Sequence, residues 1–142
     1  MHVFIQILLI LHFLGLAMGF STSFASFVMF GLIAKAAPQE KAVLGRFPPV
    51  MSRVGEIGLA LLWVTGLLLV WTHWGGFASL PWTFYVKLTA VVILTVTLWR
   101  IHTLIDKARA GDATAAARIP MFGRVAALMA LVALIFAVLT FK

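Results

Sequence analysis

Four long apolar segments constrain this chain more than any other feature. They cover residues 2–34, 54–72, 83–102 and 121–141 approximately. Each is close to or above the ~20 residues with which an α-helix crosses ~30 Å of hydrocarbon. Strands are excluded because an open sheet cannot satisfy its backbone in lipid, and four segments are too few for a barrel. The sequence therefore predicts an all-α integral membrane four-helix bundle, in a single domain over residues 1–142.

The composition agrees with a lipid environment. The chain is 63% hydrophobic and only 11% charged, whereas a soluble domain is about half apolar and about a quarter charged. The lipid bilayer is thus its expected partner. A net charge of +7 would suggest nucleic acid in a soluble protein, but these charges lie in short connections and at helix ends, so no nucleic-acid binding is expected. The absence of cysteine excludes disulfides, thiolate metal sites and covalent c-type haem attachment.

Prolines and glycines separate the four segments. The breaks are predicted at Pro38 after the first segment, Pro48-Pro49 before the second, Gly75-Gly76 after it, Pro81 near the start of the third, Gly111-Asp112 in the third connection and Pro120 at the opening of the fourth. Proline suits a helix start because the first N–H groups need no partner there.

Basic residues are distributed unevenly between the connections. They are found in the first (Lys35, Lys41, Arg46, Arg53) and the third (Arg100, Lys107, Arg109, Arg118). The second connection, from His73 to Trp82, has no lysine or arginine. The positive-inside rule then places the first and third connections in the cytoplasm and both termini on the outer (periplasmic) side. The predicted location is the bacterial inner (cytoplasmic) membrane, as a multi-pass protein.

Two ionisable residues fall within the same outer half of the predicted bundle. His12 lies about three turns into the first helix and Lys87 about one turn into the third. An imidazole in the membrane needs a partner, which can be a serine, a backbone carbonyl or a metal such as haem iron. Lys87 either extends its ammonium group to the interface or binds an anion such as a porphyrin propionate.

Small residues share one face of the first helix with His12. At ~100° per residue, Gly15, Gly19 and Ser23 follow His12 along one stripe. Small side chains allow a second helix, or a flat ligand, to approach closely. The stripe therefore predicts either helix packing through Gly15-x-x-x-Gly19 or a wall of a ligand site.

Three further ionisable residues have simpler interpretations. Glu56, near the start of the second helix, is expected to pair with a cation at its level, such as Arg53, Arg100 or Arg124. His102 is expected at the interface. His73 lies in the uncharged outer connection, where an accessory ligand role is conceivable.

Three local motifs resemble small bacterial membrane proteins related to HemJ-type protoporphyrinogen oxidase and to the copper-resistance protein D domain. They are Leu11-His12-Phe13-Leu14-Gly15-Leu16, Arg53-Val54-Gly55-Glu56-Ile57-Gly58 leading to Thr65-Gly66-Leu67-Leu68, and Trp82-Thr83-Phe84-Tyr85-Val86-Lys87-Leu88. The resemblance covers nearly the whole chain in helix layout. It implies that His12 is associated with haem b and that His12 and Lys87 form the functional pair.

The preferred hypothesis is a haem b- or porphyrin-binding membrane protein with a redox or porphyrin-handling role. His12 would be the iron ligand, and Lys87, Gly15, Gly19 and Ser23 would complete the cofactor site; no catalytic residue is assigned. The alternative is a non-enzymatic membrane protein, either a small subunit of a larger membrane complex or a copper-uptake relative. Expected partners are the bilayer, a porphyrin ligand, and a second copy of the chain or a larger complex.

Overall fold

The computed structural model describes residues 1–140 of the chain. Within this range the chain is helical and contains no strand. The elements are α1 (His2–Lys35), α2 (Pro38–Leu44), α3 (Phe47–His73), the short 3-10 helix η1 (Phe77–Ser79), α4 (Trp82–Arg109) and α5 (Ala113–Thr140). Four of these helices, α1, α3, α4 and α5, are long and apolar enough to cross a membrane. The prediction of an all-α chain with four helices long and apolar enough to cross a membrane is confirmed for these residues.

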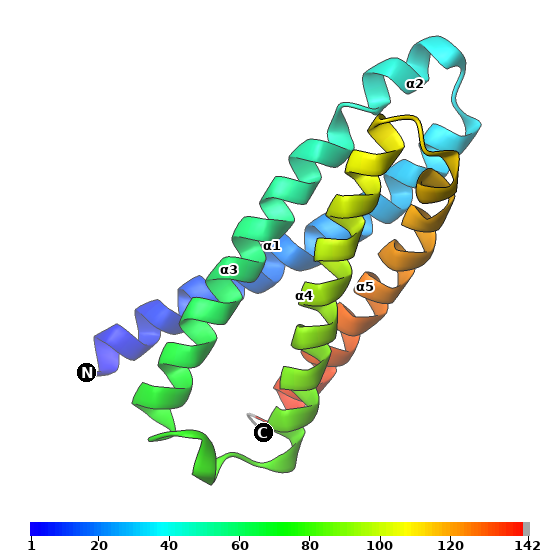
Figure 1. Cartoon of the computed structure of the whole chain (residues 1–142). Coiled ribbons are helices and arrows are strands. Elements are labelled where there is room, and N and C mark those ends of the chain that lie inside the picture. The colour runs from blue at the N-terminus through cyan, green and yellow to red at the C-terminus, as the bar shows by residue number, and fades with distance from the viewer. Residues whose placement is uncertain (141–142) are drawn as a thin grey trace.

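The four long helices form two closely packed pairs. α1 packs along α3, and α4 packs along α5, while contact between the pairs is made mainly by α1 with α5. Figure 1 shows the start of α1, the end of α5 at Thr140 and η1 at one end of the molecule, and α2 with the α4–α5 turn at the other. We call these the terminal end and the α2 end.

Glycines and one aspartate make the turns between helices. Gly75 and Gly76 connect α3 to η1 with φ values of 69° and 126°, which L side chains rarely adopt. Gly111, with φ of 101°, ends the α4–α5 connection. Asp112 then caps α5, because its Oδ1 accepts hydrogen bonds from the backbone N–H groups of Thr114 and Ala115 at 3.0 and 3.2 Å.

Two helices begin earlier than the sequence predicted, because proline does not stop them. α3 begins at Phe47 and contains Pro48-Pro49 in its first turn, where the backbone N–H groups need no helical partner. The prediction that α3 starts near Val54 was therefore wrong. Pro120 does not open α5, which begins at Ala113 and carries Pro120 in its interior. The Asp112 cap and the alanines that follow favour a helix before Pro120 is reached.

The other comparisons between the predicted and the observed helices concern where each helix begins and ends. α1 matches the first predicted segment closely, and α4 continues past His102 to Arg109. The short helix α2, which begins at Pro38, was not predicted. The predicted end of the last helix at Phe141 lies outside the described residues.

Glycines bring α1 and α3 into backbone contact. A Cβ atom on Gly15 would lie 2.7 Å from the carbonyl oxygen of Gly58, and a Cβ atom on Gly58 would lie 2.9 Å from the carbonyl oxygen of Gly15. One turn further along, a Cβ atom on Gly55 would lie 3.2 Å from Thr22 Oγ1. The helices approach this closely only because these positions have no side chain.

Side-chain hydrogen bonds supply polar links between α3 and α4, which lie in different pairs. Trp63 Nε1 donates to Thr95 Oγ1 at 3.0 Å. Nearer the α2 end, His102 of α4 contacts Ser52 and Glu56 of α3. Because α3 and α4 meet through side chains rather than through close backbone contact, space remains between them.

We predict that Gly15→Ala destabilises the fold by about 1–3 kcal/mol, because the new methyl group overpacks against the backbone of α3. Unfolding of the detergent-solubilised protein by added dodecyl sulfate, followed by circular dichroism, measures this loss. Gly31→Ala is the matched control, since a Cβ atom at Gly31 of the same helix would have no neighbour within 4 Å. Equal stability of the two variants would contradict the close contact.

Candidate functional site

A cavity of about 490 Å³ lies between the helix pairs in the half of the molecule nearer the terminal end. Its wall contains His12 and Gly19 from α1, Gly66 from α3 and Lys87 from α4. The rest of the wall is almost entirely aliphatic and aromatic, with further residues from α5 and η1. We call this space the His12 cavity. Its volume lies within the ~300–1,000 Å³ typical of small-molecule sites.

The hydrogen bonds around His12 determine which ring nitrogen carries the proton. His12 Nδ1 lies 2.8 Å from Thr65 Oγ1. The same Thr65 hydroxyl donates its hydrogen to the carbonyl oxygen of Leu61, one turn earlier in α3. Because a hydroxyl has one hydrogen and a carbonyl can only accept, Thr65 must accept from His12 Nδ1–H. In neutral His12, the lone pair is then on Nε2.

This arrangement suits a histidine that binds a metal or accepts a proton through Nε2. Metal-binding histidines commonly donate their other N–H to an oxygen, which fixes the tautomer and the ring orientation. Within residues 1–140, His12 Nε2 makes no hydrogen bond. Gly66 gives the ring room, since a Cβ atom there would lie 3.3 Å from His12 Cε1.

Lys87 is the cation of the His12 cavity. It lies in the second turn of α4, and its side chain is in the wall of the cavity that also contains His12. Its Nζ is 6.0 Å from the centre of the Phe84 ring, near the outer limit of a cation–π contact. An ammonium group and an imidazole thus share one predominantly apolar cavity.

The predicted small-residue stripe divides between three environments. Gly15 lies in the α1–α3 contact rather than in a cavity wall. Gly19 lines the His12 cavity, and a Cβ atom there would have no neighbour within 4 Å. Ser23 lines a second cavity and donates a hydrogen bond to the carbonyl oxygen of Gly19 at 2.9 Å. Of the three, only Gly19 accompanies His12 and Lys87.

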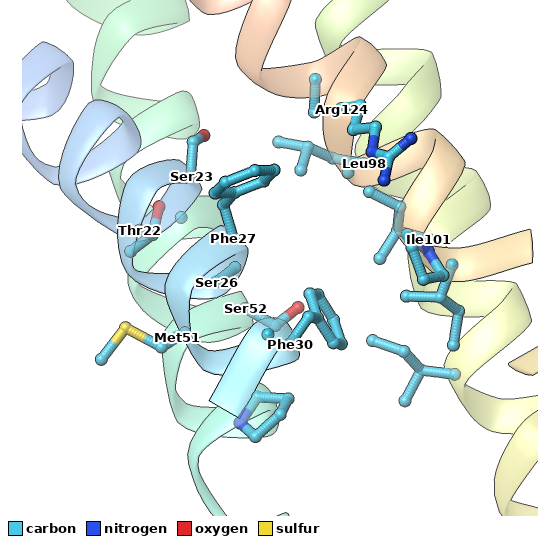
Figure 2. Close-up of a pocket in the computed structure, with 18 of the residues that line it drawn as sticks. Thr22, Ser23, Ser26, Phe27, Phe30, Met51, Ser52, Leu98, Ile101 and Arg124 are labelled. Carbon is cyan, nitrogen blue, oxygen red and sulfur yellow. The ribbon is translucent and has the colours of Figure 1, made fainter. Parts of the chain in front are cut away.

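The second cavity, of about 370 Å³, lies toward the α2 end between the same helix pairs. We call it the Arg124 cavity, after the one cation in its wall. Figure 2 shows Phe27 and Phe30 of α1 facing Arg124 of α5 and Ile101 of α4 across this space. Ser26 of α1 and Ser52 of α3 add hydroxyl groups to the wall.

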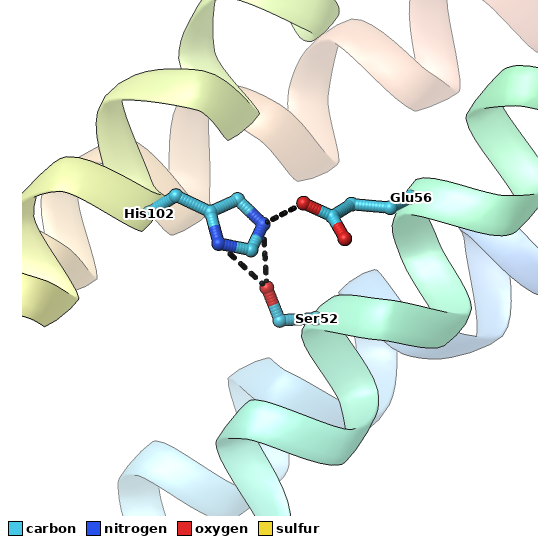
Figure 3. A network of polar contacts seen from close by, with 3 residues as sticks. All are labelled: Ser52, Glu56 and His102. Carbon is cyan, nitrogen blue, oxygen red and sulfur yellow. Dashed lines mark hydrogen bonds and ion pairs between the residues drawn. The ribbon is translucent and has the colours of Figure 1, made fainter.

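A polar cluster next to the Arg124 cavity joins α3 to α4 (Figure 3). His102 Nε2 lies 2.8 Å from Glu56 Oε1 and 2.8 Å from Ser52 Oγ. The prediction that Glu56 pairs with Arg53, Arg100 or Arg124 was wrong, because the ion-pair partner in the described residues is His102. The imidazole reaches Glu56 from the facing helix and links the two helix pairs.

The other histidine singled out from the sequence lies apart from the His12 cavity. His73 is the last residue of α3, and its ring packs edge-on against Trp74 with 5.6 Å between ring centres. Within residues 1–140, no three His, Asp or Glu side chains come close enough to hold a metal ion together. His12 is thus the imidazole available in the His12 cavity.

Sequence reasoning missed the residues that orient His12. Thr65 and Gly66 were noted only as part of a family resemblance. A threonine next to a glycine in an apolar helix can indicate a polar contact between helices, since hydroxyl groups in membrane helices form hydrogen bonds across helix contacts. What the sequence lacks is the register of α3 against α1, which decides that Thr65 meets His12.

Comparison of the chain with protein-family models, with curated proteins and with solved structures gives no match. The arguments about function therefore depend on the residues and the geometry of the two cavities.

We predict that Thr65→Val destabilises the protein by about 1–3 kcal/mol, because it leaves the buried Nδ1–H of His12 without an acceptor. Thr65→Ser is the matched control, since it keeps the hydroxyl and removes only a methyl group. Unfolding in mixed micelles measures both. A Val variant as stable as the Ser variant would show that the hydroxyl does not hold the ring.

Proposed function

We propose that this chain is a membrane protein that binds haem b or a related porphyrin in the His12 cavity, in a redox or porphyrin-handling role. His12 would hold the iron through Nε2, and Lys87 would contact a carboxylate of the ligand. The observation that carries the proposal is the hydrogen-bond chain from His12 Nδ1 through Thr65 Oγ1 to the carbonyl oxygen of Leu61. This chain leaves the Nε2 lone pair for a metal ion.

The donor set of the cavity fits a porphyrin. A macrocycle brings four nitrogen ligands of its own, so one protein imidazole is sufficient to hold its iron. The apolar wall, which includes Phe20, Trp63 and Phe84, suits a large flat hydrophobic ring. Gly19 and Gly66 keep the wall near His12 free of side chains. A haem bound here would supply one-electron chemistry at its iron.

Lys87 supports an acidic ligand rather than a fully apolar one. Apart from Lys87, every lysine and arginine within residues 1–140 lies toward the α2 end. An ammonium group in a predominantly apolar cavity can form a charge-assisted hydrogen bond with a carboxylate of the ligand. Porphyrins of the haem b type carry two such carboxylates.

We further propose that the α2 end faces the cytoplasm and that both termini are periplasmic, in a bacterial inner membrane. The concentration of basic residues at the α2 end supports this orientation through the positive-inside rule. The His12 cavity would then lie in the periplasmic half of the membrane. The HemJ-type resemblance places the same two residue types, a first-helix histidine and a third-helix lysine, at the functional site.

Absorbance of the detergent-purified protein, before and after titration with hemin, tests the proposal. The wild type is expected to convert the spectrum of free hemin to that of a ligated haem, with a Soret band that shifts on reduction, and His12→Ala is expected to leave the spectrum of free hemin. His73→Ala is the matched control, because His73 lies outside the cavity, and it should behave as wild type. A wild type that leaves the spectrum of added hemin unchanged at every concentration would overturn the proposal and favour a small subunit of a larger complex.

We also expect Lys87→Gln to weaken hemin binding by roughly tenfold or more, because a charge-assisted hydrogen bond to a carboxylate is lost. Lys87→Arg should keep part of the affinity, since the positive charge remains. Hemin dimethyl ester separates this role from a structural one, because it has no free carboxylate. Its affinity should be the same for the wild type and Lys87→Gln; an equal loss for both ligands would contradict a carboxylate contact.

A further inference from the structure

Arg124 is a cation placed within a membrane-spanning helix. α5 is long and apolar enough to cross a membrane, and it carries no charged residue from Val125 to Thr140. Arg124 thus lies at the border of this uncharged stretch. Side chains of α-helices lean toward the helix start, so the guanidinium is directed back toward the α2 end. A cation at this depth is costly unless it meets an anion or polar headgroups.

Residues 1–140 supply no partner for this charge. Within residues 1–140 the Arg124 side chain makes no hydrogen bond and no ion pair. Glu56, the acidic residue closest to Arg124 in its position along the length of the bundle, is paired with His102 instead. Ser26, in the wall of the same cavity, also has no hydrogen-bond partner in this range. A guanidinium and a hydroxyl are therefore both available to a ligand in the Arg124 cavity.

The cavity opens between α1 and α5. Its exposed wall residues include Phe27 and Gly31 from α1, and Pro120 and Arg124 from α5. The wall residues from α4, including Ile101 and Ile105, are partly buried. Because α1 and α5 are membrane-spanning helices, this opening faces the lipid and not water.

We propose that the Arg124 cavity binds an anionic phospholipid from the leaflet at the α2 end. Arg124 pairs with the head-group phosphate, and Ser26 donates a hydrogen bond to a phosphate or glycerol oxygen. The start of an acyl chain lies against Phe27 and Phe30. Basic pockets between membrane helices at one leaflet are a recurrent form of lipid recognition, because charge and apolar surface are offered together.

The surrounding charge favours an anionic lipid over a zwitterionic one. Nine lysines and arginines lie toward the α2 end, against the four acidic residues of the whole chain. This excess attracts anionic lipids to the leaflet next to the cavity. A zwitterionic head group would bring its own cation close to Arg124 and lose part of the gain. The site is separate from the His12 cavity, so it does not depend on porphyrin binding.

Native mass spectrometry of the detergent-solubilised full chain tests the proposal, using phosphatidylglycerol and phosphatidylcholine of the same acyl chains. The wild type is expected to retain phosphatidylglycerol with an affinity roughly tenfold or more above that for phosphatidylcholine. Arg124→Gln should remove this preference. Arg118→Gln is the charge-matched control, because Arg118 lies in the same helix but outside the cavity wall, and most of the preference should survive. Equal losses in the two variants would overturn the site.

A second pair of variants tests the cavity without changing the charge. Gly123 lines the Arg124 cavity, and a Cβ atom there would have no neighbour within 4 Å. Gly123→Leu should therefore fold, fill the cavity and reduce phosphatidylglycerol retention at least as much as Arg124→Gln. Gly19→Leu fills the His12 cavity instead and should leave lipid retention unchanged. Retention by Gly123→Leu at the wild-type level would refute the proposal.

A water-soluble anion is the remaining alternative occupant. Glycerol 3-phosphate carries the same phosphate without acyl chains. The proposal expects no binding of it at concentrations where phosphatidylglycerol is retained. Binding of equal strength that depends on Arg124 would replace the lipid with a soluble phosphate ligand and overturn the proposal.

Discussion

The backbone contact between Gly15 and Gly58 is the constraint on which the other features depend. It holds α1 in its register against α3, because the two backbones lie this close only where no side chain stands between them. In this register the face of α1 one turn before Gly15 meets the part of α3 that follows Leu61 and Leu62. His12 therefore lies opposite Thr65, and its proton position follows from that hydroxyl. A glycine contact thus determines, through helix register, which nitrogen of a histidine has a free lone pair.

Tight packing within each helix pair has a consequence for the space between the pairs. α4 and α5 pack through small buried residues such as Ala126, Ala130 and Ala133, and α1 and α3 pack through glycines. Links between the pairs depend more on longer side chains, including the Trp63–Thr95 hydrogen bond and the His102–Glu56 ion pair. Side chains of this length keep α3 and α4 apart. The two cavities lie in the resulting space, each with one cation in its wall.

The sequence was sufficient for the number of long apolar helices and for the position of His12 and Lys87 toward the same end of the bundle, because hydropathy and segment order depend only on local composition. The sequence was less informative where two local rules predict different structures. Pro120 is a helix breaker by itself, yet the Asp112 cap and the alanines before it start α5 earlier. The predicted partner of Glu56 was wrong. The prediction considered only which cations lie at the same level as Glu56, and these were arginines, whereas the rotation of α4 about its axis brings His102 to Glu56. The rotation and the register of a helix are set by its packing against other helices, and this information is not contained in the sequence of one segment.

The separation of the two cavities decides whether a ligand could pass from one cavity to the other. A buried cluster of Leu94, Ala126 and Ala130, with Phe20 packed against it, lies between them. Leu94 and Ala130 belong to the wall of the His12 cavity, and Ala126 to that of the Arg124 cavity. Passage of a ligand from one to the other would require this cluster to open and the helix pairs to move apart. That movement would break the Trp63–Thr95 hydrogen bond, which lies at the level of the His12 cavity. In the packed arrangement the two cavities are therefore separate, and an acidic ligand in either one would meet a different cation.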